Sequence, residues 1–546
     1  MRGLGRASKG SLLFVLSALL LSACHFQPPV TAAKLDPSRG GSATEAIVGR
    51  PGSLNPLFAA EDDARDIDAL VYQGLTTIGR DQQPAPMLAS HWSISADGLT
   101  YVFTLRQGVR WADGQPLTVD DVLFTFGVLQ SPAYPGATGT FWRDVKVDSP
   151  GAWQIRFVLK APSASFPAAL RIGIIPRHAF HDQSVPGVAD DPHSSGQAFG
   201  TGPFQVSSIS GDGLTVTLIR NTYARPAPYL DTFVFRSYPT AADAIAGMVA
   251  GEADVLGGLQ PPQLDALVKR PDISVRQIPT FTFTALILNT DPSGGPFGDP
   301  AVRLALQRGV DRQGLIKGVL AGRGLVDLGP IPPSDWAYTP PATPKATSYD
   351  LAAAAAGLTA AGWTPDPKTG LRAKGGTALR VTLDAANAYP YLQVADAVRK
   401  QLRKIGVVVD VQPVSASELV GRYLVGRNFQ MVLAAFDNGP DPDQWTLWHS
   451  GQPAGGLNFA LNLPHQALID KDLEDGRAGQ TRAARKAAYA DFQALLWQAS
   501  PALFLYEPDY LYAVSSRVKG VSTNPVLDPA DRFLGVAGWY VSTRNQ

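Results

Sequence analysis

The sequence predicts an α/β fold that is divided into more than one domain. Its 546 residues are 45% hydrophobic, and a chain of this length is too long for one compact core, so two or three domains are expected. Residues 379–435 alternate between short apolar strands and helical patterns, which is typical of an open α/β sheet. Ligands of such sheets bind at loops beyond the strand ends, so the loop after residue 435 is the first candidate for a site.

The first 23 residues are interpreted as a secretory signal. Arg2, Arg6 and Lys9 form a basic start, and the nearly continuous apolar run that follows, 11–21, is shorter than the roughly 20 residues of a membrane-spanning helix. Cys24 is the only cysteine, so an internal disulfide is excluded. Residues 21–24, Leu-Ser-Ala-Cys, resemble the bacterial lipobox, which implies lipidation of Cys24. The alternative is a soluble secreted protein with a chance cysteine at the cleavage point.

Charge and composition argue against nucleic acid as a partner. The full chain has 47 basic and 47 acidic residues, and loss of the three basic residues of the signal leaves 44 against 47. Such a weak balance provides no strong field of either sign. Residues 24–43 are rich in Pro, Ser, Gly and Ala without periodicity, which predicts a flexible tether.

The next part of the chain carries clear local signals. Residues 44–49 are expected to form a strand and residues 66–75 a helix, from their apolar spacing. Tyr101, Phe103 and Leu105 alternate within a strand over 100–106, and Asp97-Gly98 before it predicts a hairpin. A tight turn at 113–114 precedes a helix that is expected to start at residue 117 or 118, with Thr118 as its cap.

Several of these pieces together resemble one family. The segments 86–92 (Pro-Met-Leu-Ala-Ser-His-Trp), 101–106, 108–114 (Gly-Val-Arg-Trp-Ala-Asp-Gly), 117–122 and 200–206 (Gly-Thr-Gly-Pro-Phe-Gln-Val) are similar to motifs of the extracellular solute-binding proteins of family 5. These are the dipeptide- and oligopeptide-binding lipoproteins of ABC importers. The resemblance covers nearly all of 44–520. It implies a two-lobed periplasmic-binding-protein fold of type II, with an inserted subdomain and a hinged interlobe cleft.

The resemblance also implies a division of the chain. Lobe I is expected to comprise residues 44–77, 201–283 and 512–546, the inserted subdomain residues 78–200, and lobe II residues 284–511. The expected protein is an extracytoplasmic, membrane-anchored monomer that binds peptides and delivers them to the transmembrane permease subunits of an ABC transporter. It is expected to have no catalytic activity and no cofactor.

Candidate ligand-binding residues cluster after the apolar strand 430–435. In peptide-binding relatives an aspartate just after this strand pairs with the ligand α-amino group, and Asp437 is the matching residue, with Ala435 offering backbone pairing. A free amine is cationic near neutral pH, so its burial needs a carboxylate. Asp441 and Asp443 compete for this role, a turn-capping role is the bland alternative, and Pro440 lengthens the loop relative to close dipeptide-binding relatives. Trp445 and Asn289 are weaker candidates, because helix packing and bonds within the crossing strand explain them equally well.

Other functions have less support in the sequence. His178, His181 and His193 lie near Asp182, Asp190 and Asp191, but the surrounding Ser, Gly and Pro favour a solvated loop over a metal site. Gly200-Thr201-Gly202 lacks the Lys-Ser or Lys-Thr of a phosphate loop. No His-Glu-x-x-His or Gly-x-Ser-x-Gly motif is present. Two alternatives remain open: an importer receptor for an oligosaccharide, an opine or a metal chelate, and a secreted hydrolase.

Overall fold

The computed structural model describes residues 37–541 except 137, 292–294, 343–347, 440, 453–456, 460–461, 523–525 and 527. The signal segment and Cys24 lie outside these residues, as does Pro440. Among the described residues, no helix combines the length and apolar character needed to cross a membrane.

A large mixed sheet forms the centre of the described chain. Its strands are β1 (Ser42–Val48), β8 (Phe204–Ile209), β9 (Thr215–Arg220), β10 (Thr232–Tyr238), β11 (Val255–Leu259), β12 (Ile273–Pro279), β13 (Thr282–Leu288), β14 (Gly324–Val326), β18 (Arg380–Ala386), β19 (Val408–Val414), β20 (Met431–Asp437) and β21 (Ala502–Ser515). They lie in the order β19-β18-β20-β13-β21-β11-β1-β10-β9-β8, and β12 and β14 also pair with β21. The mixed α/β class predicted from the sequence is confirmed.

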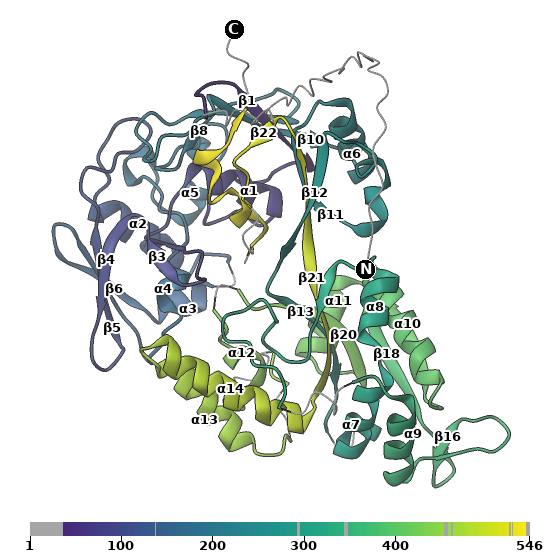
Figure 1. Ribbon diagram of the computed structural model, residues 1–546. Coiled ribbons are helices and arrows are strands. Elements are labelled where there is room, and N and C mark those ends of the chain that lie inside the picture. Colours follow the sequence, from purple (N-terminus) through teal and green to yellow (C-terminus); the bar gives the residue numbers. More distant parts are fainter. Residues whose placement is uncertain are drawn as a thin grey trace, which may run out of the picture. The chain divides into compact units, whose positions relative to one another are not determined.

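Strand β21 connects the two halves of this sheet (Figure 1). Its first part pairs with β13 and its second part with β12, both antiparallel. Strands β12 and β13 are separated only by Thr280 and Phe281, and Phe281 has a positive φ of 57°. Two chain crossings therefore run side by side. The lobe boundaries expected at 283/284 and 511/512 fall inside β13 and β21.

Two apolar cores cover the faces of the half of the sheet that contains β13, β18, β19 and β20. On β13, Leu286 and Leu288 belong to one core, whereas Phe283, Ala285 and Ile287 belong to the other. Alternate side chains of a strand point to opposite faces of the sheet. A strand that is buried on both faces therefore needs a continuous apolar run, as β13 has. The covering helices are α7 (Pro300–Gly309), α8 (Arg312–Val319), α9 (Leu351–Ala360), α10 (Tyr391–Arg403), α12 (Trp445–Trp448), α13 (Gln466–Ala478) and α14 (Arg482–Ala499).

The inserted segment forms a separate four-stranded antiparallel sheet. Its strands β4 (Ala89–Ile94), β5 (Thr100–Leu105), β6 (Lys146–Gly151) and β7 (Gln154–Val158) lie in the order β4-β5-β7-β6. Tyr101, Phe103 and Leu105 are buried while the residues between them are less so, as the alternation predicted. Gly98 has a φ of +70°, and Asp97 Oδ1 accepts a hydrogen bond from Leu99 N at 3.0 Å. The predicted hairpin is therefore confirmed.

Helix α2 (Val119–Gln130) starts directly after Thr118, the residue that the sequence predicted as its cap. The carboxylate of Asp121 accepts hydrogen bonds from Thr118 N at 2.9 Å and from Thr118 Oγ1 at 3.1 Å. Phe126 packs against Trp142 of α3 (Gly139–Arg143) and Phe157 of β7. The aromatic residues of this region are therefore scaffold.

Helix α1 spans Asp62–Val71, four residues earlier than expected. Asp62 and Asp63 lie in its first turn, where acids are favourable, and the backbone becomes extended at Tyr72. Gly202 N donates to Val71 O at 2.8 Å, and a Cβ on Gly200 would lie 2.1 Å from the same oxygen. The Gly-Thr-Gly turn therefore allows two backbones to approach closely and is not a phosphate loop.

Short elements complete the described chain. They are β2 (Thr76–Ile78), β3 (Pro84–Pro86), α4 (Phe166–Ala169), α5 (Val185–Asp190), α6 (Ala241–Ala250), β15 (Thr364–Pro365), β16 (Arg372–Lys374), β17 (Thr377–Ala378), α11 (Ala416–Glu418), β22 (Val518–Lys519) and β23 (Tyr540–Val541), with single turns that include η2 (Pro192–Ser194), η8 (Pro529–Phe533) and η9 (Val536–Gly538).

Candidate functional site

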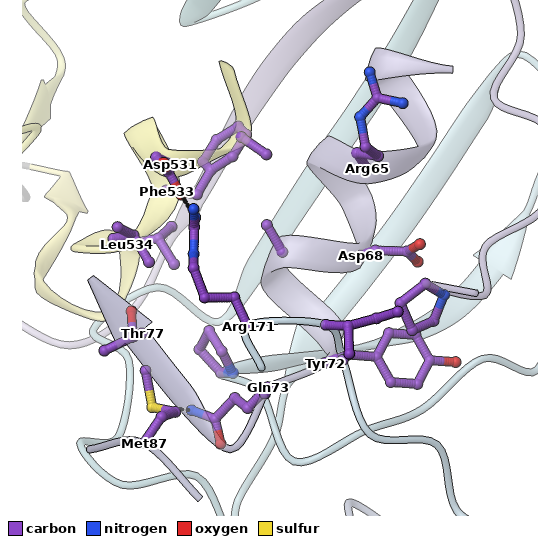
Figure 2. A pocket seen from close by; sticks show the side chains of 18 of the residues that line it. Arg65, Asp68, Tyr72, Gln73, Thr77, Met87, Arg171, Asp531, Phe533 and Leu534 are labelled. Carbon is purple, nitrogen blue, oxygen red and sulfur yellow. Dashed lines mark hydrogen bonds and ion pairs between the residues drawn. The ribbon is translucent and has the colours of Figure 1, made fainter. Parts of the chain in front are cut away.

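A cavity with a volume of about 400 Å³ lies beside helix α1. One face of α1 forms a wall through Arg65, Asp68, Ala69 and Tyr72. Other walls come from β2, the loops at 171–173 and 224–226, and the C-terminal segment 528–537. Figure 2 shows Arg171 and the C-terminal residues Asp531, Phe533 and Leu534 at this space. Elements far apart in the sequence therefore enclose one space.

Ion pairs hold the C-terminal wall of this cavity in place. Arg171 pairs with Asp531, toward which Figure 2 shows it directed. Arg65 pairs with Asp62 on its own helix, and its Nε lies 3.7 Å from Asp528 Oδ2. The cavity thus combines oriented charges with apolar side chains, among them Met87, Ile172, Phe533, Leu534 and Val536.

Asp437 is the last residue of strand β20. Its carboxylate is close enough to the charged residues Arg171, Asp528 and Asp531 of the cavity to interact with them electrostatically. Asp437 pairs with Thr282 of β13 and is exposed, and its Oδ1 accepts a hydrogen bond from Gly439 N at 2.7 Å. Surrounding protein displaces part of its hydration and raises its pKa. Asp528 and Asp531 raise this pKa further, whereas the Gly439 bond and Arg171 lower it. A cation near Asp437 would therefore also be attracted by the cavity carboxylates.

The structure separates the three aspartates of the loop after β20. Asp441 is buried and pairs with Arg485, and Asp443 pairs with Arg477 at 2.7 Å. No salt bridge joins Asp437 to a cation among the described residues. The two competitors are thus neutralised by α13 and α14, and Asp437 keeps a carboxylate that can serve a ligand.

None of the four predicted ligand residues, Asp437, Ala435, Trp445 and Asn289, lines the cavity. Ala435 faces Thr284 in the β13–β20 ladder, and the β18–β20 ladder ends at Ala385–Leu433. The second edge of β20 is therefore not paired with β18 at Ala435.

Asn289 and Trp445 are engaged in contacts with their own scaffold. Asn289 Nδ2 donates to Phe429 O at 2.9 Å, and Asn289 Oδ1 accepts from Asp291 N at 3.1 Å, so this amide closes the end of β13. The ring of Trp445 stacks on His449 with centroids 3.3 Å apart, and the Arg477 guanidinium lies 4.4 Å from it. These contacts explain both residues as packing.

The histidine-rich loop does not assemble a metal site among the residues that the structure describes. His178 Nε2 lies 2.8 Å from Asp113 Oδ2, and His193 Nδ1 lies 2.8 Å from Asp191 Oδ1. Asp182 instead accepts from Ser184 N at 2.9 Å, ahead of α5. His178, His193, Asp182 and Asp191 are therefore used in separate local contacts.

Sequence reasoning did not identify the cavity residues Asp68, Arg171, Asp531 and Leu534. Asp68 sits between the apolar residues Ile67, Leu70 and Val71, where a solvent-facing acid would be equally compatible with an amphipathic helix. Arg171 and Asp531 are 360 residues apart in the chain. A local sequence pattern cannot predict an ion pair between residues this far apart.

A family profile matches residues 83–458, more than half of the chain, and its description is bacterial extracellular solute-binding proteins, family 5. The chain belongs to this family. Two solute-binding relatives match over most of their length. The oligopeptide-binding protein AppA of Bacillus subtilis is 27% identical over 97% of this chain and 98% of that protein, and the probable D,D-dipeptide-binding periplasmic protein DdpA of Escherichia coli is 24% identical over 88% and 90%.

Two solved structures have the same fold as this chain. The structure of AppA from Bacillus subtilis in complex with a nonapeptide superimposes with a TM-score of 0.71 at 26% identity, covering 93% of this chain and 100% of that one. HbpA2 from Haemophilus parasuis gives a TM-score of 0.78 at 21% identity, covering 92% and 100%. The type II periplasmic-binding-protein fold expected from the sequence is thereby confirmed, and the family is one of solute receptors located outside the cytoplasm.

Proposed function

We propose that this protein captures peptides between its two lobes and delivers them to the permease subunits of an ABC importer. Peptide-binding relatives that match over nearly the whole chain support the ligand class. The observation that carries the proposal is Asp437, the one aspartate of its loop that no arginine neutralises among the described residues. This carboxylate is suited to the ammonium group of a peptide N-terminus.

The backbone of the ligand has a matching partner in β20. The edge of β20 beyond Leu433 has no ladder with β18, so the peptide groups near Ala435 can pair with an extended ligand. Main-chain pairing contributes affinity without reading side chains. Hinge motion at Phe281 and the neighbouring stretch of β21 would let the lobes close around the ligand.

The experiment is mass spectrometry of ligands that co-purify with the protein, followed by calorimetric titration with a mixed peptide library. Peptides in the co-purified material and saturable library binding are the expected results. Recovery of only glycans, opines or a metal complex would replace the peptide by one of those ligands. Turnover of an added compound would instead support a secreted hydrolase.

Membrane attachment forms the second part of the proposal. Lipidation of Cys24 would anchor a monomeric receptor to the outer face of the membrane or in the periplasm, with the segment before β1 as tether. Replacing Cys24 with Ser should release the protein into the soluble fraction of cells. Persistent membrane association of Cys24→Ser would contradict lipid anchoring.

A further inference from the structure

Asp68 is an anomaly in the wall of the cavity. Its side chain belongs to α1, the residue is only 5% exposed, and it lines the cavity together with Arg65, Ala69 and Tyr72. Neither carboxyl oxygen has a hydrogen-bond partner among the described residues. A buried carboxyl without partners is costly, so its presence at a cavity calls for a ligand group that supplies the missing contacts.

The arginines of the cavity are all engaged elsewhere. Arg65 pairs with Asp62 and Asp528, and Arg171 pairs with Asp531. Arg225 donates to the carbonyl oxygens of Thr222 and Ala224, at 3.1 and 2.7 Å. Among the described residues, no arginine of the cavity is therefore paired with Asp68, although three line the same space.

We infer that Asp68 binds the cationic end of a lysine or arginine side chain of the peptide ligand. This inference rests on the proposed function and names a specificity within it. An ammonium or guanidinium group brings several N–H donors and a positive charge, which are what a partnerless carboxylate lacks. The apolar residues of the cavity suit the methylene stem of such a side chain.

Leu534 illustrates how the stem would be accommodated. It is 53% exposed although it lines the cavity, and it lies next to buried Phe533 in the C-terminal wall. Covering exposed apolar surface with a ligand removes it from water and therefore favours binding. An aliphatic stem that ends in a cation uses both features of the cavity.

Contact with the ligand requires a movement of Asp68. Both carboxyl oxygens are closed off from solvent, so the side chain must turn toward the cavity or its cover must shift. Because the carboxyl makes no hydrogen bond, the turn breaks none. The movement requires a change of side-chain rotamer and local repacking.

Binding of a cation to Asp68 should be linked to proton release. Burial raises the pKa of Asp68 well above its usual range, and no charged group counteracts this. The carboxyl is therefore favoured in its neutral form, and an arriving cation would drive off the proton. The titratable and charged groups around it are Arg65 of α1, Tyr72 directly after this helix, Arg171, Arg225, Asp528 directly before η8, and Asp531 of η8. The four charged groups of this set that form ion pairs stay paired, so they are not the source of the proton.

The test compares tripeptides of alanine that carry lysine, or its uncharged analogue norleucine, at the first, second or third position. Calorimetry with the wild-type protein should show, for one position, that the lysine peptide binds about tenfold or more tightly than the norleucine peptide. Runs in phosphate and in Tris, whose ionisation enthalpies differ, should reveal proton release with that lysine peptide only.

Asp68→Asn is the diagnostic variant, because the amide has nearly the same shape but no charge. It should lose the lysine preference and the proton release, while binding norleucine peptides within about twofold of wild type. Its thermal midpoint should be unchanged or higher, since it removes a buried ionisable group without removing a bond. A lower midpoint with an intact lysine preference would assign Asp68 a structural role.

Asp384→Asn provides the matched control. Asp384 is a buried acid of β18 with a pKa raised by burial to about 6, and it does not line the cavity. This variant should retain both the lysine preference and the proton release. Equal binding of lysine and norleucine peptides at all three positions by the wild-type protein would overturn the inference alone. Failure of every peptide to bind would overturn the proposed function as well.

Discussion

Arg532 provides the sharpest test of how the cavity is held together. Its side chain is 1% exposed and donates to Asp66 of α1 and to Glu45 of β1, at 2.7 and 3.0 Å for one bond to each. Burial raises the pKa of Glu45 to about 7 although Arg532 opposes this. The guanidinium thus ties η8, which forms part of the C-terminal wall, to α1 and β1.

Replacing Arg532 with Met would leave two buried carboxylates without their cation. Removing one partner from a buried ion pair costs about 3–5 kcal/mol. The loss should be largest near pH 8, because below that pH the acids can take up protons and no longer need the cation. The contribution of Glu45 to wild-type stability should fall as pH rises from about 4.5 to about 7, since folded Glu45 retains its proton over that window and unfolded Glu45 does not.

The assay is urea unfolding followed by circular dichroism at pH 5.5 and pH 8. Arg380→Met is the control, because Arg380 pairs with Asp410 on the surface at 2.8 Å with side chains 60% and 40% exposed. Such a pair contributes about 0–1 kcal/mol. Equal losses for the two variants, or a loss for Arg532→Met that does not depend on pH, would refute the reasoning.

Two further variants probe the scaffold. Gly200→Ala should destabilise the protein, or prevent its accumulation in soluble form, because the added Cβ would lie 2.1 Å from Val71 O. As a control, Gly211→Ala adds a Cβ that meets no atom within 4 Å, so its thermal midpoint should stay within about 2 °C of the wild-type value. Arg485→Met should leave the buried Asp441 carboxylate without its cation and lower the free energy of unfolding by about 3–5 kcal/mol. A double variant that also carries Asp441→Asn should recover part of this loss in the same unfolding experiment.

Local signals explain which parts of the fold could be predicted. The alternation of Tyr101, Phe103 and Leu105 and the Asp97-Gly98 turn each depend on neighbouring residues, and the structure confirms both. Family resemblance added the order of the elements and the loop that follows β20. The same local reasoning misplaced α1 by four residues, because Asp62 and Asp63 start the helix before its apolar pattern becomes visible.

Long-range features could not be predicted from local patterns. Arg532 bonds to Glu45 across 487 residues, and neither residue has a neighbour in the sequence that points to the other. The cavity is similarly built from segments hundreds of residues apart. The position of Asp437 after β20 marked it as a candidate in the sequence. The sequence could not separate it from Asp441 and Asp443, because the arginines that pair with these two lie on the distant helices α14 and α13.

The central claim is that Asp437 receives the ammonium group of a peptide ligand. Its most direct test is calorimetry of a single peptide in free and N-acetylated form, with the wild-type protein and with Asp437→Ala. A charge-assisted hydrogen bond of about 1.5–3 kcal/mol corresponds to roughly 10- to 150-fold in affinity. The variant should lose that factor for the free peptide and little for the acetylated one, whereas equal losses for both peptides would show that Asp437 does not bind the amine.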